Sequence, residues 1–160
     1  MEEREDEFNW TDKDKKFMNR LIGIGSFLIM GIIISLAPSC PEKTPEFYFG
    51  YGQHYMAEKD YIQAQRFYSK AIKSKPDYFD AYYQRALAWE QTDSIQNSIR
   101  DYDSLLTFKN IKGDKVSELY YMRGNMHYLL SQDTLACNDW KRSRDLGYNK
   151  AYDRVRLRCK

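Results

Sequence analysis

Three cysteines and two histidines carry the side chains in this sequence that most readily do chemistry. They do not stand at metal-binding spacings, and the sequence has no Gly-rich phosphate loop and no nucleophile motif. The carboxylates are scattered over expected helix starts and polar faces, where helix capping and solubility explain them. We therefore expect a protein that is not an enzyme, with no catalytic residue, no metal and no cofactor, and with no small-molecule substrate and no nucleic acid as partner.

An apolar run at residues 21–37 contains no charged residue. As a helix it would rise about 25 Å, slightly less than a membrane span needs. Lys16 and Arg20 can lengthen the span by reaching to the interface, and a soluble helix of this length would show a polar face. We expect a transmembrane helix or a secretion-signal core at 21–37, followed by a proline-containing linker at 38–44.

Positive charge gathers before this run. Four basic residues lie between positions 13 and 20, whereas only Lys43 follows the run closely. Positively charged flanks stay on the cytoplasmic side, so residues 1–20 are predicted to be cytoplasmic and the remainder periplasmic or otherwise extracytoplasmic. The long core and the acidic start favour a retained single-pass anchor over a cleaved signal.

Cys40 supports an alternative form of attachment. The stretch Leu36 to Cys40 resembles the lipobox of bacterial lipoproteins, in which the cysteine carries lipid. The match is partial, because Ala37 stands where that pattern has a large aliphatic residue and Pro38 is unusual there. The alternative is therefore a lipid-anchored envelope lipoprotein attached through Cys40.

The rest of the chain contains an internal repeat at residues 45–78, 79–110 and 117–148. Aromatic and small residues recur in step, with the small residues Gly52, Ala86 and Gly124 at one shared position. Small residues let helices approach closely, and aromatic side chains fill the remaining volume. One segment of each copy follows the helical period of 3.6 residues, for example through Tyr61, Ala64, Tyr68 and Ala71, so we expect an all-α stack of repeated units.

The copies resemble the tetratricopeptide repeat, a pair of antiparallel helices of 34 residues. The resemblance implies a right-handed superhelix of about three helix pairs in residues 45–148, closed by a polar capping helix at 149–160. The family's leucine in the seventh position is replaced by Tyr51, Arg85 and Arg123. The first copy matches the family's main positions through Tyr48, Gly52, Tyr55, Ala64, Tyr68, Ala71 and Pro76.

Two local features follow from this pattern. Asp60 and Gln63 are placed to form a capping box at the start of the second helix of the first copy. The extra residues around Gly113, in the stretch 109–116, are expected to form a longer loop.

The resemblance also implies a binding surface. In the family, the first helix of each pair lines a concave face that holds a peptide of a partner protein. The residues at these positions are mostly aromatic, Met or amide residues, which favours apolar or mixed peptides over the acidic tails of heat-shock chaperones. Each aromatic could instead pack between helices. The predicted groove residues are Phe49, Gln53, Met56, Tyr83, Gln84, Leu87, Tyr121, Met122, Asn125 and Tyr128.

The remaining reactive side chains have plain structural interpretations. His54 and His127 fall at helix-packing positions, so we interpret both as structural. Cys137 and Cys159 could form a disulfide between the third copy and the capping helix in an oxidising compartment, or could be two free thiols, and the sequence leaves both open.

Function is therefore expected to be protein binding. The first hypothesis is a membrane-tethered scaffold that binds a partner peptide or protein, of a kind the sequence does not name, in the concave groove. The alternative is an envelope lipoprotein that assists assembly or stability of a complex through its convex face or its basic C-terminal face. Residues 141–160 hold eight Lys or Arg against two Asp, which a solvated final helix also explains.

Overall fold

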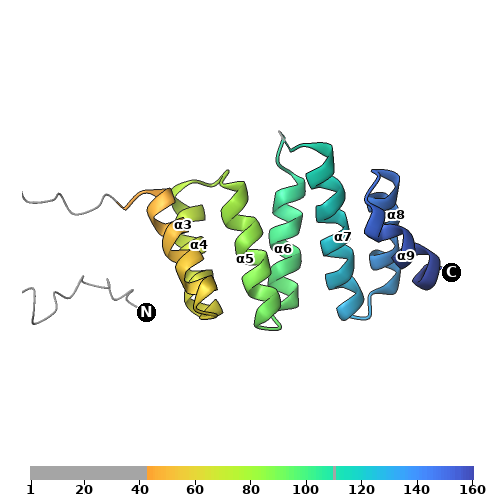
Figure 1. The fold of residues 1–160 in the computed structure, drawn as a ribbon, viewed down its shortest axis with the longest axis horizontal. Coiled ribbons are helices and arrows are strands. Elements are labelled where there is room, and N and C mark those ends of the chain that lie inside the picture. The colour runs from red at the N-terminus through yellow and green to blue at the C-terminus, as the bar shows by residue number, and fades with distance from the viewer. Residues whose placement is uncertain (1–42, 110) are drawn as a thin grey trace, which may run out of the picture. The chain divides into compact units, whose positions relative to one another are not determined.

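The computed structural model describes residues 43–109 and 111–160. Within these residues the chain forms seven α-helices and no strand, which confirms the all-α prediction. Each helix packs on its neighbours in the chain, so the helices stand side by side in chain order (Figure 1). They are α3 (Pro45–Ala57), α4 (Tyr61–Ser74), α5 (Phe79–Gln91), α6 (Ile95–Leu106), α7 (Gly113–Leu129), α8 (Asp133–Asp145) and α9 (Asn149–Arg158).

The helices form three pairs, α3 with α4, α5 with α6, and α7 with α8, and α9 packs on α8. The same tight turn joins the two helices of every pair. Lys59, Asp93 and Ser131 each follow the C-cap of the first helix and each adopt a positive φ, of 60°, 53° and 57°. A left-handed residue at this place stops a helix, so the three pairs share one turn geometry.

Polar side chains define where the first two helices begin. Thr44 Oγ1 accepts a hydrogen bond of 3.1 Å from the Phe47 N–H, and Pro45 occupies the first turn of α3. Asp60 Oδ1 accepts from the Gln63 N–H at 3.1 Å, as predicted for α4. The reciprocal half of the predicted capping box is absent, because the Asp60 N–H donates to the Tyr55 carbonyl instead.

The small residues of the repeat make room for large rings. Tyr68, Tyr102 and Trp140 occupy equivalent places in the second helices and are fully buried. A Cβ atom at Gly52 would overlap the Tyr68 ring, and one at Gly124 would lie 2.8 Å from Trp140 Cδ1. Glycine at these positions therefore permits the helices of the first and third pairs to pack as closely as they do.

Arg85 of the second pair forms an ion pair with the buried Asp101. Arg85 Nε and Nη2 donate to Asp101 Oδ2 and Oδ1 at 2.9 and 2.7 Å, and Nη1 donates to Ser69 Oγ of the preceding pair at 2.8 Å. Burial raises the pKa of Asp101, and the hydrogen bonds and charge of Arg85 lower it. One side chain thus connects both helices of its pair to the pair before it.

The third pair repeats this arrangement. Arg123 donates to both carboxylate oxygens of Asp139, at 2.8 and 2.7 Å, and to Asp103 Oδ1 of the preceding pair at 2.7 Å. The hydrogen bond with Asp139 is the main cause that raises the pKa of Arg123. In the first pair the same two positions hold Tyr51 and Phe67, whose rings stack with centroids 5.3 Å apart.

The insertion between the second and third pairs is not wholly a loop. Helix α7 begins at Gly113, so residues 113–116 form its first turn, and the prediction of a longer loop is wrong for these four residues. Asp114 in this first turn stabilises the helix N-terminus, and the Ser117 hydroxyl donates to the Asp114 carbonyl at 2.7 Å.

The predicted membrane segment lies outside the described residues. Residues 1–20, the apolar run 21–37 and Cys40 all fall there, whereas Lys43 and Thr44 of the predicted linker are described. Among the helices α3 to α9, none is long and apolar enough to cross a membrane.

Candidate peptide-binding surface

The ten predicted groove residues all lie on the first helices of the pairs, α3, α5 and α7. Gln53 is exposed and the other nine are half-buried. We call this set the candidate groove. Its members differ in what they contact, and these contacts separate residues that stabilise the fold from residues that remain available to a partner.

Three members of the candidate groove, besides Tyr83, pack between helices. The Phe49 ring lies 5.6 Å from that of Tyr68 and 5.1 Å from that of Tyr78, centroid to centroid. Met56 packs against the buried cluster around Tyr68, and Met122 packs against the larger cluster around Tyr102. Changes at these three positions would disturb the core as well as any binding surface.

Tyr83 connects two neighbouring pairs through a polar contact. Its hydroxyl donates to Glu118 Oε1 on α7 at 3.2 Å, and Lys115 Nζ lies 5.7 Å from its ring centroid. Burial raises the pKa of the Tyr83 hydroxyl, and the negative charge of Glu118 raises it further. The hydroxyl therefore stays protonated and remains a donor to Glu118.

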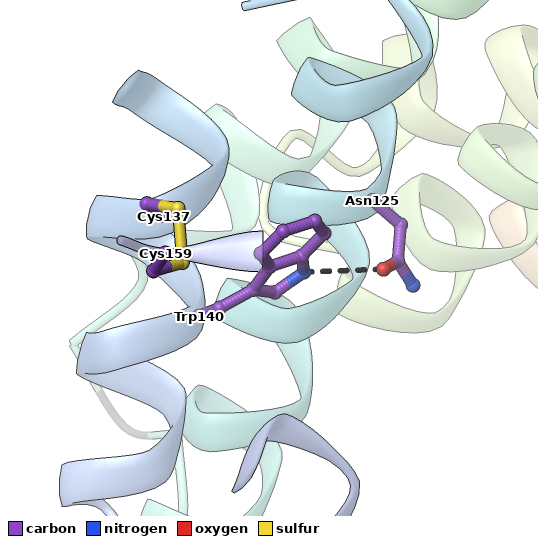
Figure 2. The surroundings of a disulfide bond; sticks show 4 residues. All are labelled: Asn125, Cys137, Trp140 and Cys159. Carbon is purple, nitrogen blue, oxygen red and sulfur yellow. Dashed lines mark hydrogen bonds between the residues drawn. A yellow bond between two sulfur atoms is a disulfide. The ribbon is translucent and has the colours of Figure 1, made fainter. Parts of the chain in front are cut away.

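Asn125 and Tyr128 pack against the buried indole of the third pair. Trp140 Nε1 donates to Asn125 Oδ1 at 3.1 Å, and the Tyr128 ring centroid lies 5.5 Å from that of Trp140 (Figure 2). Asn125 thus satisfies the one polar atom of a fully buried side chain. Its amide is engaged within the fold, unlike that of the exposed Gln53.

A disulfide joins Cys137 of α8 to Cys159, the residue that follows α9, beside Trp140 (Figure 2). The two Cα atoms are 5.4 Å apart, within the usual range for such a bridge. The bond ties the last helix to the third pair at its C-terminal end. Ala151, which is fully buried, holds α9 near its N-terminal end.

Solved structures resemble this arrangement of helix pairs. The first TPR of Spaghetti (RPAP3), bound to an HSP90 peptide, is 19% identical, with a TM-score of 0.61 over 71% of this chain and 89% of that one. The N-terminal domain of STI-1 from C. elegans is 16% identical, with a TM-score of 0.67 over 72% and 94%. The Arabidopsis OM64 TPR domain is 22% identical, with a TM-score of 0.60 over 71% and 95%.

The chain has the fold of a tetratricopeptide-repeat (TPR) domain. No protein-family model and no curated protein matches its sequence. The assignment of the fold thus rests on the three-dimensional similarity of the chain to these structures.

Neither histidine of the TPR domain belongs to a metal site. His127 Nδ1 lies 2.7 Å from Gln132 Oε1, and Nε2 lies 3.9 Å from Asp139 Oδ2, whereas His54 is exposed beside Tyr55. Within the described part of the chain, no three His, Cys, Asp or Glu side chains are grouped so that they could hold a metal ion.

Sequence reasoning missed two features of the TPR domain. The first is the partners of Arg85 and Arg123, although Asp101 and Asp139 follow them at the same separation of 16 residues. The second is the position of the basic face of α9, which the sequence indicated but did not place beside hollows that reach Tyr121 and Tyr128. Its signal was the four-residue spacing of basic residues in the final helix.

Proposed function

We propose that this TPR domain is a non-catalytic scaffold that binds a partner protein or peptide through the candidate groove. The observation that carries the proposal is the row of half-buried aromatic, Met and amide side chains that α3, α5 and α7 present at equivalent positions. Such side chains give contact area and hydrogen bonds at little cost in conformational freedom. The first TPR of Spaghetti (RPAP3) holds an HSP90 peptide and the similar second TPR domain of human RPAP3 holds an HSP70 peptide, which supports a peptide as the kind of partner.

The scaffold is further proposed to be tethered to a membrane by residues 21–37, with its N-terminus cytoplasmic and the TPR domain periplasmic or extracytoplasmic. Support comes from the uncharged apolar run, from the basic residues before it, and from the disulfide, which is typical of an oxidising compartment. The alternative is attachment through a lipid on Cys40, with the domain assisting assembly of an envelope complex through its convex or basic C-terminal face.

The groove can be tested by photo-crosslinking, which leaves the packing intact. A photoreactive amino acid at the exposed Gln53 of α3 should crosslink to a defined partner protein in intact cells. The matched control is Gln96, an exposed glutamine on α6, where the same group should give no crosslink to that protein. Crosslinks from Gln96 alone would place binding elsewhere, and none from any exposed position would argue against a scaffold.

The tether can be tested by labelling cells with a clickable fatty acid and washing membranes with alkaline carbonate. If the anchor is a transmembrane helix, we expect the chain to stay in the washed membrane and to carry no label. The Cys40→Ser variant should give the same result. A label that disappears in Cys40→Ser would instead establish the lipoprotein alternative. Release of the unlabelled chain by carbonate would exclude both forms of attachment.

A further inference from the structure

Two neighbouring hollows run along α9 at the C-terminal end of the TPR domain. The first has a volume of 630 Å³ and reaches Tyr128 on α7, and the second has a volume of 400 Å³ and reaches Tyr121 on the same helix. Both are lined by Leu157 and Arg158 of α9. Because they share these residues, the two hollows adjoin each other along α9, and we call them together the α9 groove.

The α9 groove is basic. Lys150, Arg154 and Arg158 follow one another at intervals of four residues, which places them on one face of the helix, and all three line the groove. Lys160 adds a fourth basic residue in the larger hollow. The acidic lining residues are Asp133 and Asp153.

Local pairing leaves this positive charge largely uncompensated. Asp153 Oδ1 already accepts a hydrogen bond of 2.9 Å from Arg156, which does not line these two hollows. Asp133 lies in the first turn of α8, where the helix N-terminus stabilises its carboxylate. The groove therefore presents an excess of basic side chains to whatever enters it.

Aromatic rings orient the two arginines of this groove, and neither is paired with a carboxylate of residues 43–109 or 111–160. The Arg154 guanidinium lies 5.6 Å from the Trp140 ring centroid, and that of Arg158 lies 5.2 Å from the Tyr128 ring centroid. Within the described residues, no carboxylate forms an ion pair with either of them. Stacking on a ring orients a guanidinium while its N–H groups remain free for a carboxylate.

Two half-buried arginines of the same fold form internal ion pairs. Arg85 and Arg123 each bind both oxygens of an aspartate on their own helix pair. Arg154 and Arg158 have the same chemistry without such an aspartate. The N–H groups of these two arginines are therefore available to a ligand.

Apolar side chains border the same groove. Leu129 and Leu157 keep 61% and 63% of their surface exposed, and both line the larger hollow. Large exposed leucines beside unpaired arginines suit a ligand that offers both carboxylates and an apolar side chain. The disulfide and the buried Ala151 hold α9 at both ends, so this surface is preformed.

We propose that the α9 groove binds an acidic peptide segment that also carries a large apolar side chain. Carboxylates of the peptide pair with Arg154 and Arg158, and its apolar side chain covers Leu157. A nucleic acid is a poorer fit, because a phosphate backbone needs an extended basic track, whereas this groove has four basic residues and two exposed leucines. The inference rests on the proposed peptide-binding function and places the acidic part of the ligand at the C-terminal end, beside Tyr121 and Tyr128 of the candidate groove.

The test selects random short peptides displayed on phage against the purified full-length chain in detergent micelles. Selected peptides should be enriched in Asp and Glu together with Leu, Phe or Trp. The affinity of a selected peptide, measured by fluorescence anisotropy, should fall at least about tenfold in the variant Arg154→Glu with Arg158→Glu, and should weaken as salt is raised. Amidation of its carboxylates should cause a similar loss.

The matched control is Arg142→Glu, which reverses an exposed arginine on α8 that lines neither hollow, and should leave affinity unchanged. If the double charge reversal unfolds the chain by circular dichroism, Arg154→Gln with Arg158→Gln serves in its place. Three results would overturn the inference. They are an equal loss of peptide affinity in Arg142→Glu, selected peptides that are not enriched in Asp and Glu, and tighter binding of a single-stranded DNA oligonucleotide or of anionic vesicles. If a selected peptide instead crosslinks to a photoreactive residue placed at Gln53, the proposed function in the candidate groove would still be supported.

Discussion

Replacing Gly52 by alanine should destabilise the domain, whereas the same change at Gly50, in the same helix, should stabilise it. A Cβ atom at Gly52 would overlap the ring of Tyr68, which is fully buried and has no room to move. Overpacking of this kind costs about 1–3 kcal/mol. Gly50 is exposed with no atom near its Cβ position, so alanine there gains up to about 1 kcal/mol from its higher helix propensity.

The measurement is urea unfolding followed by far-ultraviolet circular dichroism, with the free energies of unfolding compared between the two variants. Both substitutions add one methyl group to α3, so helix propensity is matched, whereas only the Gly52 variant places that group against the buried Tyr68 ring. Gly124→Ala provides a second instance, because its Cβ would lie 2.8 Å from Trp140 Cδ1. Equal changes in stability at Gly50 and Gly52 would show that close packing does not require glycine.

Breaking the ion pair between Arg85 and Asp101 should cost more than any other single polar change in the second helix pair. Asp101 keeps only 5% of its side-chain surface exposed, so Arg85→Tyr leaves a buried carboxylate without a cation. Losing one partner of a buried pair costs about 3–5 kcal/mol, and the 18% exposure of the Arg85 side chain favours the lower end. Unfolding free energies of the single variants provide the measurement.

The chain itself supplies the control for this prediction. The first helix pair has Tyr51 stacked on Phe67 at the equivalent positions, so Arg85→Tyr combined with Asp101→Phe imitates a contact that the fold already uses. The double variant should recover most of the lost free energy of unfolding. A double-mutant cycle measures this recovery as the coupling energy between the two positions. A double variant as unstable as the sum of the two singles would refute this account.

The loss in Arg85→Tyr should also depend on pH. Burial already raises the pKa of Asp101, and Arg85 is the main group that lowers it, with a smaller effect from Trp89. Without Arg85 the folded-state pKa rises further above the unfolded value, so the folded state binds a proton more tightly. The destabilisation should be full at neutral pH and should shrink as the pH falls through that raised pKa.

Much of the fold could be predicted because its determinants are local and repeated. Small residues such as Gly52 and Gly124, with the aromatic positions around them, recur at one period, and a period of that length implies stacked helix pairs. The Asp60 cap could be predicted because its hydrogen bond spans three residues. The first turn of α7 was missed, because Gly113 suggested a loop while its helix is stabilised by later contacts.

The candidate site was less predictable. The repeat pattern placed Phe49 and Gln53 on the same helix face but could not separate them, and only the contact of Phe49 with Tyr68 shows that it packs in the core. From the sequence, the charged residues of the last helix are explained by a solvated capping helix. The peptide-binding role proposed for these residues depends on Tyr121 and Tyr128, which belong to α7, two helices earlier in the chain.

The sequence by itself therefore determined the helix pairs, their order and the close-packed positions, because helix periodicity, caps and small residues act over a few neighbours in the chain. Only the tertiary structure decided which carboxylate each arginine binds, which aromatic rings are buried, and where α9 meets α7. Those outcomes depend on the distance between side chains of different helices, and a carboxylate pairs with a guanidinium only within a few ångströms. Packing brings Asp101 to Arg85 and leaves Arg154 and Arg158 open to a partner.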